Sequence, residues 1–287
     1  MRFWAGAAFT GALSTGRECT ADVLPGPALI TVVARARASQ APREDFYDPW
    51  AEEVVRGLTP EQIKSVETGR VNAGILVREL VFDAAVAKIL KDKPQGVVAN
   101  LGAGLDSRPF RLGDLAAQWY DYDLPDGVEA RRAVYAEDAA HHFVAADVLQ
   151  PDFVGLLPPR VDLFYACGVF MYFKAEALNA MFARLARHSP GAAVLFDTST
   201  PFFACHAHRI VRGIKAGLFG GWGFKYDARP EQVEALFPAL GDVEVGNYGD
   251  SGLLSRLHGS MKLFFRLLRP VFTDSLFVTA RLRERGV

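Results

Sequence analysis

The chain has 287 residues, half of them hydrophobic, so it can bury the core of one large domain or of one domain with a cap. Its 32 basic and 33 acidic residues give a net charge of −1, which argues against a nucleic-acid partner, because nucleic-acid-binding proteins carry a basic excess. The 3 cysteines are too scattered for a disulfide framework or a zinc site, and no apolar run approaches the ~18 residues of a membrane span. We therefore expect a cytoplasmic protein with no metal and no membrane span.

Residues 1–21 are expected to lie outside the folded domain. They have a short basic start, an apolar middle and no acidic residue before Glu18, a pattern that faintly resembles a signal or transit peptide. We favour a flexible N-terminal extension rich in alanine and glycine, and a targeting segment stays as the alternative.

Residues 22–94 are predicted to form a helical cap. The helical segments expected within it are 27–39, 48–58 and 72–93. The last segment has apolar residues at helical spacing, namely Ile75, Leu80, Ala84 and Ala87.

From residue 97 onward, the pattern alternates between strands and helices. The predicted strands cover 97–101, 119–123, 142–146, 161–166, 192–197, 242–248 and 275–282. A helix over 175–188 carries the apolar stripe Leu178, Met181, Phe182 and Leu185. This alternation predicts an α/β fold over 95–287, with a doubly wound, mostly parallel, Rossmann-like sheet of about seven strands. The last two strands lack a crossover of the usual length, so we expect them to form an antiparallel pair.

The stretch "VVANLGAGLDSRPFRL" (97–112) is typical of a strand, a tight glycine turn and a helix. Gly102 and Gly104 permit the turn, and Pro109 suits the first turn of the helix. Such a turn presents backbone N–H groups to a ligand at a helix N-terminus. Dinucleotide-binding folds have a third glycine where Ser107 stands here, which disfavours NAD(P). The chain also lacks a phosphate-binding loop with the Gly-Lys signature.

Acidic residues follow the next two predicted strands. Asp123 ends the second strand, where a carboxylate can accept both hydroxyls of a ribose; a solvated Asp before a turn is the structural alternative. After the third strand, Asp147 can accept the amino group of adenine while Val148 packs on the ring. Gly168, after the fourth strand, leaves open space beside a reactive centre. Because ligands bind at the carboxyl ends of such strands, these residues favour S-adenosylmethionine, which carries adenine and ribose without phosphates.

These segments together resemble the leucine carboxyl methyltransferase family, in particular its bacterial branch related to tetracenomycin-type polyketide O-methyltransferases. The resemblance covers about residues 22–200 and implies a class I S-adenosylmethionine-dependent methyltransferase. It implies that Arg78, five residues before Asp83, holds the carboxylate of the cofactor, and it matches Arg35 loosely to a basic residue of an N-terminal lid. The predicted cofactor contacts are Arg78, Gly102, Gly104, Asp123, Leu124, Asp147, Val148 and Cys167.

The chain departs from this family at Cys167. Family members commonly carry Glu at this position, near the amino group of the cofactor. A neutral residue loses a charge-assisted contact, which implies either weaker cofactor binding or another acid in its place. For Cys167 itself we favour a packed small hydrophobe over a reactive thiol.

We expect insertions at about 201–230 and 250–272 to form the acceptor pocket. The pattern of the second insertion predicts a helix that covers the pocket as a lid. Both are rich in Phe, Leu and Gly, and Trp222, Phe224 and Tyr226 are expected to be available to stack on an acceptor. This composition favours a small, apolar or aromatic molecule as the methyl acceptor.

No catalytic base is named from the sequence. His141 and His142 precede the third strand, at the edge away from the expected ligand, and His188 ends a helix. His206 and His208 follow the fifth strand at the correct edge. We expect O-methylation of a hydroxyl or carboxyl group of a small molecule. The alternatives are methylation of a protein C-terminal carboxyl group and non-catalytic binding of S-adenosylmethionine. Acceptor identity and oligomeric state are not predicted.

Overall fold

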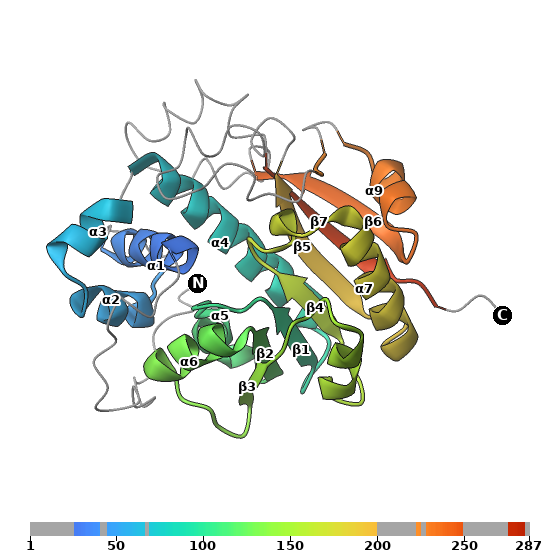
Figure 1. Ribbon diagram of the computed structural model, residues 1–287, viewed down its shortest axis with the longest axis horizontal. Coiled ribbons are helices and arrows are strands. Elements are labelled where there is room, and N and C mark those ends of the chain that lie inside the picture. The colour runs from blue at the N-terminus through green and yellow to red at the C-terminus, as the bar shows by residue number, and fades with distance from the viewer. Residues whose placement is uncertain are drawn as a thin grey trace.

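The computed structural model describes residues 26–40, 45–66, 69–199, 222–224, 228–248 and 275–284. Within these ranges the chain forms a 7-stranded sheet in the order β3-β2-β1-β4-β5-β7-β6, with helices on both faces (Figure 1). The strands are β1 (Val97–Leu101), β2 (Gln118–Asp123), β3 (His141–Ala145), β4 (Leu163–Ala166), β5 (Ala193–Ser199), β6 (Leu240–Asn247) and β7 (Ser275–Leu282). All the predicted strands are confirmed, and their ends move by at most two residues.

The sheet has the predicted doubly wound arrangement. β1 pairs in parallel with β2 and β4, β2 with β3, and β4 with β5. β7 is antiparallel to both β5 and β6, which confirms the expected antiparallel closure. The chain builds outward from β1 to β3 and then returns to place β4 on the other side of β1. Ligands bind such sheets outside the carboxyl ends of the strands at this reversal, so it sets the place to look for a site.

Side chains alternate between the two faces of the central strands, as the period of two requires. In β4, Leu163 and Tyr165 pack under α4 (Gly69–Leu90), whereas Phe164 and Ala166 face α7 (Ala175–His188) and α9 (Pro230–Leu236). The predicted apolar stripe of α7 is confirmed, because all of its side chains are 0% exposed: Leu178, Met181, Phe182 and Leu185.

The N-terminal helices α1 (Gly26–Ser39), α2 (Pro49–Arg56) and α3 (Pro60–Val66) gather beyond the β3 end of the sheet (Figure 1). They share a hydrophobic cluster with α6 (Pro125–Val134), in which Leu29 and Val33 lie with Val128 and Val134. α4 packs on the sheet and also contacts α1, where Ile75 clusters with Ile30 and Ala34. α4 therefore connects the N-terminal helices to the sheet, and the domain boundary at residue 94 stays a prediction.

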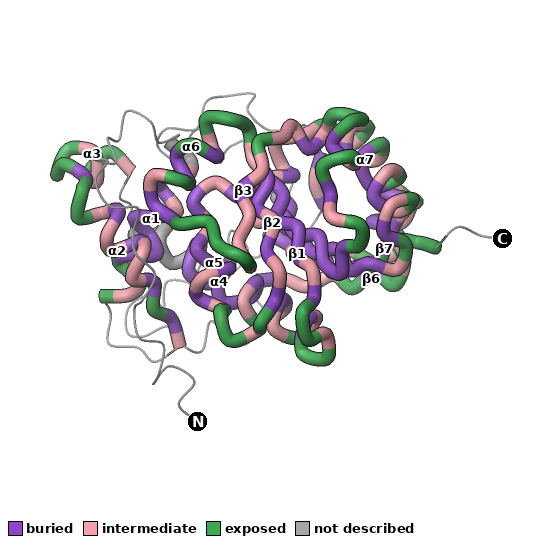
Figure 2. The backbone as a smooth tube through the Cα atoms, turned by 90° about the horizontal axis from the view of Figure 1, so that it is seen from below, coloured by how far each residue is buried: buried purple, intermediate pink, exposed green. Residues whose placement is uncertain are grey.

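Burial follows these layers. Figure 2 shows buried residues along the strands and exposed residues mainly on outer turns and helix faces. Among the described helices, none combines the length and apolar character needed to cross a membrane. The N-terminal extension, most of 201–230 and all of 250–272 lie outside the described residues.

Candidate active site

The loops that follow β1, β2, β3 and β4 meet at the carboxyl edge of the sheet. After β1, the N–H groups of Gly102 and Ala103 both donate to the carbonyl oxygen of Tyr122 in β2, at 2.8 and 2.9 Å. After β3, the N–H of Ala146 donates to the carbonyl oxygen of Asp123 at 2.8 Å. These bonds bring the predicted glycine turn and the two predicted acidic positions onto adjoining loops.

The glycine turn depends on the absence of side chains. Gly102 and Gly104 have φ values of 74° and 46°, in the left-handed region that favours glycine. A Cβ at Gly102 would lie 2.7 Å from Cγ1 of Val169, which follows β4. Gly102 therefore lets the loops after β1 and β4 approach each other at the reversal of the strand order.

Asp123 is held by the backbone around it. Its Oδ2 accepts the N–H of Gly104 at 2.6 Å, and its Oδ1 accepts the N–H of Leu124 at 2.7 Å, at the start of α6. A carboxylate has about four lone-pair sites, so these bonds leave capacity for further donors. The neighbouring Leu124 side chain is 56% exposed and offers apolar surface beside the carboxylate. This arrangement can accept two hydroxyl groups.

Asp147 and Val148 lie on the next loop. The carboxylate of Asp147 accepts the N–H of Leu149 and the side-chain amide of Gln150, both at 3.0 Å. Val148 is buried in the same hydrophobic cluster as Tyr122 and Phe153. The assignment of an adenine contact to Asp147 and Val148 stays a prediction.

A second group of predicted contacts lies where α4 crosses the ends of β4 and β5. Nη1 of Arg78 is 3.9 Å from Oδ2 of Asp197 in β5. The N–H of Gly168, which follows β4, donates to Oδ1 of Asp197 at 2.6 Å. A Cβ at Gly168 would lie 2.6 Å from Nη1 of Arg78. Burial raises the pKa of the Cys167 thiol, despite the opposing charge of Arg78, so Cys167 is neutral here.

This second group fits the amino-acid end of S-adenosylmethionine. Nε of Arg78 is buried and has no hydrogen-bond partner within the described part of the chain. The guanidinium lies against a turn whose glycine has a φ of 74°, where a side chain would be strained and would collide with it. Arg78 is thus a cation whose Nε–H is unpaired among the described residues, which suits a carboxylate.

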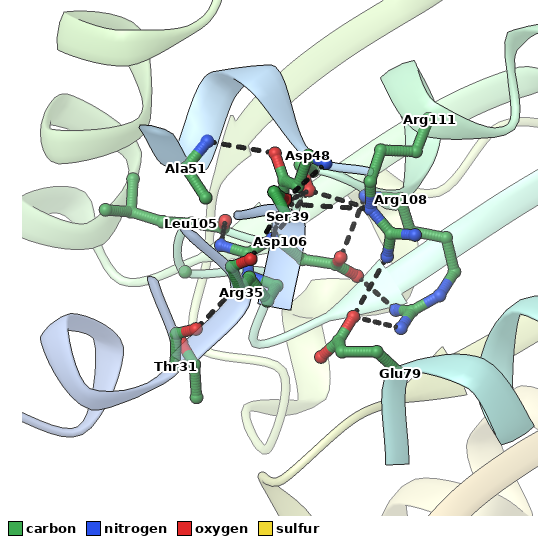
Figure 3. A network of polar contacts seen from close by, with 12 residues as sticks. Thr31, Arg35, Ser39, Asp48, Ala51, Glu79, Leu105, Asp106, Arg108 and Arg111 are labelled. Carbon is green, nitrogen blue, oxygen red and sulfur yellow. Dashed lines mark hydrogen bonds and ion pairs between the residues drawn. The ribbon is translucent and has the colours of Figure 1, made fainter. Parts of the chain in front are cut away.

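Behind the glycine turn lies a network of buried charges (Figure 3). Arg108, in the short helix α5 (Arg108–Arg111), is 0% exposed and donates to Asp106 at 2.6 Å and to Glu79 and Asp83 at 2.7 Å each. Arg111 also bonds Glu79 and Asp83. Because Glu79 and Asp83 belong to α4, the network ties the helix that carries Arg78 to the glycine turn.

The N-terminal helices join the same network. Arg35 of α1 donates to Oγ of Ser107 and to the carbonyl oxygen of Leu105, both at 2.6 Å, and pairs with Asp48 at 3.1 Å. Burial lowers the pKa of Arg35, but the carboxylate of Asp48, together with Tyr135, Glu79 and Asp106, outweighs burial and the net shift is upward. The resemblance matched Arg35 loosely to a basic residue of a lid. In the structure its side chain is buried behind the glycine turn.

Asp106 is the acidic centre of this network. Burial alone would raise the pKa of its carboxyl group, but Arg108, Arg35 and Arg111 outweigh burial and lower the pKa to about 2. The phenol of Tyr165 in β4 also donates to Asp106, at 2.9 Å. Asp106 is therefore ionised at neutral pH and fixes the turn from behind.

Sequence reasoning missed the residues that connect these parts. Asp197 ends a predicted strand, so the signal that singled out Asp123 was also present there. Arg108 and Arg111 offered no such signal, because charged residues after a turn are usually solvated. Their burial depends on acids from α4, which are distant in the sequence.

Two of the aromatic residues expected to stack on the methyl acceptor lie within the described residues. The prediction for Trp222 and Phe224 was wrong: both are only 9% exposed and pack in the core, where the indole N–H of Trp222 donates to the carbonyl of Phe173 at 2.6 Å. Tyr226, His206 and His208 lie outside the described residues.

The three histidines within the described residues lie away from the site. His141 and His142 begin β3, at its amino end, and His188 ends α7. In the described ranges no cluster of His, Cys, Asp and Glu is arranged to hold a metal ion.

A doubly wound sheet with a glycine turn after β1 and an acid at the end of β2 is the arrangement of an enzyme that binds a nucleotide or nucleoside cofactor. The family model described as leucine carboxyl methyltransferase matches residues 28–186. A relative from Streptomyces glaucescens, the tetracenomycin polyketide synthesis O-methyltransferase TcmP, is 31% identical over 79% of this chain and 84% of its own. The chain belongs to the leucine carboxyl methyltransferase family, and it is an S-adenosylmethionine-dependent methyltransferase.

Further similarities are more limited. A putative S-adenosyl-L-methionine-dependent methyltransferase from Frankia alni is 31% identical over 54% of this chain and 57% of its own. The structure of human N-acetylserotonin methyltransferase with SAM covers 89% of this chain and 66% of its own, with 13% identity and a TM-score of 0.46.

Proposed function

We propose that this methyltransferase acts on a hydroxyl or carboxyl oxygen of a small, aromatic, polyketide-type molecule in the cytoplasm. The observation that carries the proposal is the similarity to TcmP, a polyketide O-methyltransferase, over most of both chains. The apolar, Phe-rich composition of 201–230 and 250–272 supports an apolar acceptor.

We further propose roles for the residues at the carboxyl edge. Asp123 accepts the ribose hydroxyls beside Leu124, and the backbone of Gly102 and Gly104 lies along the cofactor. Arg78 binds its carboxylate. The support is geometric: the carboxylate of Asp123 is fixed by two backbone donors and Arg78 has an unused donor.

When bound, S-adenosylmethionine supplies a methyl group on a positively charged sulfur. The acceptor oxygen would attack the methyl carbon in line with the bond to sulfur, which leaves as the thioether of S-adenosylhomocysteine. Most of the acceleration of such a displacement can come from orientation, so the chain's task is to hold both partners in a dry site. The network behind the glycine turn supports that task, because Arg108 is fully buried and its bond to Asp106 holds the turn in place. A carboxylate acceptor needs no base, whereas a phenol benefits from one.

The test is a methylation assay with radiolabelled S-adenosylmethionine and a panel of polyketide phenols and aromatic carboxylic acids. We expect S-adenosylhomocysteine and one O-methylated product, with Asp123→Ala, assayed at limiting cofactor, as the control of reduced activity. The family description favours a second acceptor, the C-terminal carboxyl group of a protein ending in leucine, so the panel includes a peptide of that type. If only the peptide is methylated, the acceptor is a protein C-terminus and the proposed small-molecule acceptor is wrong. Cofactor binding without any transfer would favour non-catalytic binding.

A further inference from the structure

Arg78 differs from the other arginines near the glycine turn in how its charge is balanced. Arg108 and Arg111 are 0% and 1% exposed in their side chains and bond two or more carboxylates each. The side chain of Arg78 is 17% exposed, and among the described residues its paired carboxylate is that of Asp197, at 3.9 Å. The neighbouring Glu79 is already bonded to Arg108 and Arg111. Arg78 therefore retains donors for a ligand, and Asp197 is the acid beside them.

Asp197 is fixed on its other side. It is 2% exposed, and its Oδ1 accepts the N–H of Gly168 at 2.6 Å. Its Oδ2 faces Nη1 of Arg78 at 3.9 Å, which is too long for a direct hydrogen bond. Arg78 and Asp197 therefore form a long ion pair at the carboxyl edge of the sheet, with no direct hydrogen bond between them.

This pair matches one kind of ligand better than others. A carboxylate alone would gain Arg78 but would come close to the like charge of Asp197. An α-amino acid carries an ammonium and a carboxylate on the same carbon, so it offers an opposite charge to each side chain. Burial raises the pKa of the Asp197 carboxyl group, against the effect of Arg78, and a bound ammonium would favour its ionised form.

Building on the proposed function, we propose that Asp197 binds the ammonium group of the cofactor while Arg78 binds its carboxylate. The two side chains thus select the zwitterionic end of S-adenosylmethionine. Asp197 supplies the negative charge that the neutral Cys167, on the adjoining turn, does not.

The experiment compares three ligands by calorimetry on wild type and Asp197→Asn. The ligands are S-adenosylhomocysteine, its deaminated analogue with only the carboxylate, and 5′-methylthioadenosine, which lacks the amino-acid end. Asn keeps the shape and an acceptor for Gly168 but removes the charge. We expect Asp197→Asn to weaken S-adenosylhomocysteine binding about 10- to 100-fold, the loss of one charge-assisted contact. Binding of the other two ligands should weaken by no more than about two-fold, since neither carries the ammonium.

A matched control is Asp152→Asn, which removes an exposed carboxylate in the 3-10 helix η3 (Pro151–Leu156) and should change nothing. An equal loss for all three ligands would show that Asp197 only maintains the fold, and unchanged S-adenosylhomocysteine binding would also overturn the proposal. Wild type provides a test that needs no variant: it must bind S-adenosylhomocysteine more tightly than the deaminated analogue. If wild type binds S-adenosylhomocysteine and the deaminated analogue equally well, the role of Asp197 is overturned but the proposed function is not. If wild type binds none of the three ligands, the proposed function is overturned as well.

Discussion

Gly127 of α6 lies directly against the carboxylate of Asp123. A Cβ at Gly127 would be 2.7 Å from Cγ and from Oδ1 of Asp123, closer than real Cβ contacts allow. The helix that begins after β2 therefore leaves room for the acid at the end of β2, and residue 127 controls where that acid points.

Gly127→Ala should separate cofactor binding from stability. Alanine favours a helix over glycine, which offsets part of the cost of moving Asp123, so we expect the variant to fold. Its methyl group displaces the Asp123 carboxylate, and we expect about 10-fold weaker S-adenosylhomocysteine binding, the loss of one hydrogen bond to a charged group. Gly113→Ala is the matched control, because a Cβ there meets nothing within 4 Å. Equal affinities for the two variants would show that Asp123 adapts without loss.

Asp123→Ala should be the most damaging single change among the proposed cofactor contacts. It removes the acceptor for both ribose hydroxyls and the partner of the Gly104 N–H, so we expect about 10- to 150-fold weaker binding. Calorimetry on the folded variant measures this. The control Asp126→Ala removes an exposed carboxylate from the first turn of α6, three residues after Asp123. It should leave the affinity for S-adenosylhomocysteine unchanged. A wild-type dissociation constant in Asp123→Ala would contradict the ribose assignment.

Arg108→Met should be strongly destabilising. The change leaves Asp106, Glu79 and Asp83 short of a buried partner, and breaking buried pairs of this kind costs about 3–5 kcal/mol. Urea unfolding followed by circular dichroism gives the loss directly. Arg56→Met serves as the control, because Arg56 is 69% exposed in its surface pair with Glu53 and should cost at most about 1 kcal/mol. Similar losses in both variants would mean that the buried network adds nothing.

Acid should weaken the fold through Asp106. Its pKa is lowered from 3.8 to about 2 in the folded chain, so its ionised form stabilises the fold above pH 4. That contribution, roughly 2 kcal/mol, disappears as the pH falls from about 4 to 2. Unfolding free energies of wild type and Asp106→Asn, measured from pH 5 to pH 2.5, should converge in acid. Parallel curves would show that Asp106 is not the titrating group.

The fold was predictable because its signals are local. Alternation of strand and helix, with glycine and proline at the boundaries, located every strand of the described part of the chain. The apolar stripe of α7 predicted the face on which this helix packs. The reversal between β1 and β4 then brought Gly102, Asp123 and Gly168 to one edge. What the sequence could not reveal depends on long-range contacts: Arg108 is buried only because acids of α4 reach it. Trp222 carried an aromatic signal that suits a pocket and a core equally well, and here it packs in the core.

The central claim is that the carboxyl edge of β1–β4 binds S-adenosylmethionine, and calorimetry with S-adenosylhomocysteine and NAD on wild-type protein tests it most directly. We predict one saturable site for S-adenosylhomocysteine, weakened in Asp123→Ala, and no heat of binding for NAD, since Ser107 stands where dinucleotide-binding turns have their third glycine. Saturable binding of NAD with no response to S-adenosylhomocysteine would contradict the account.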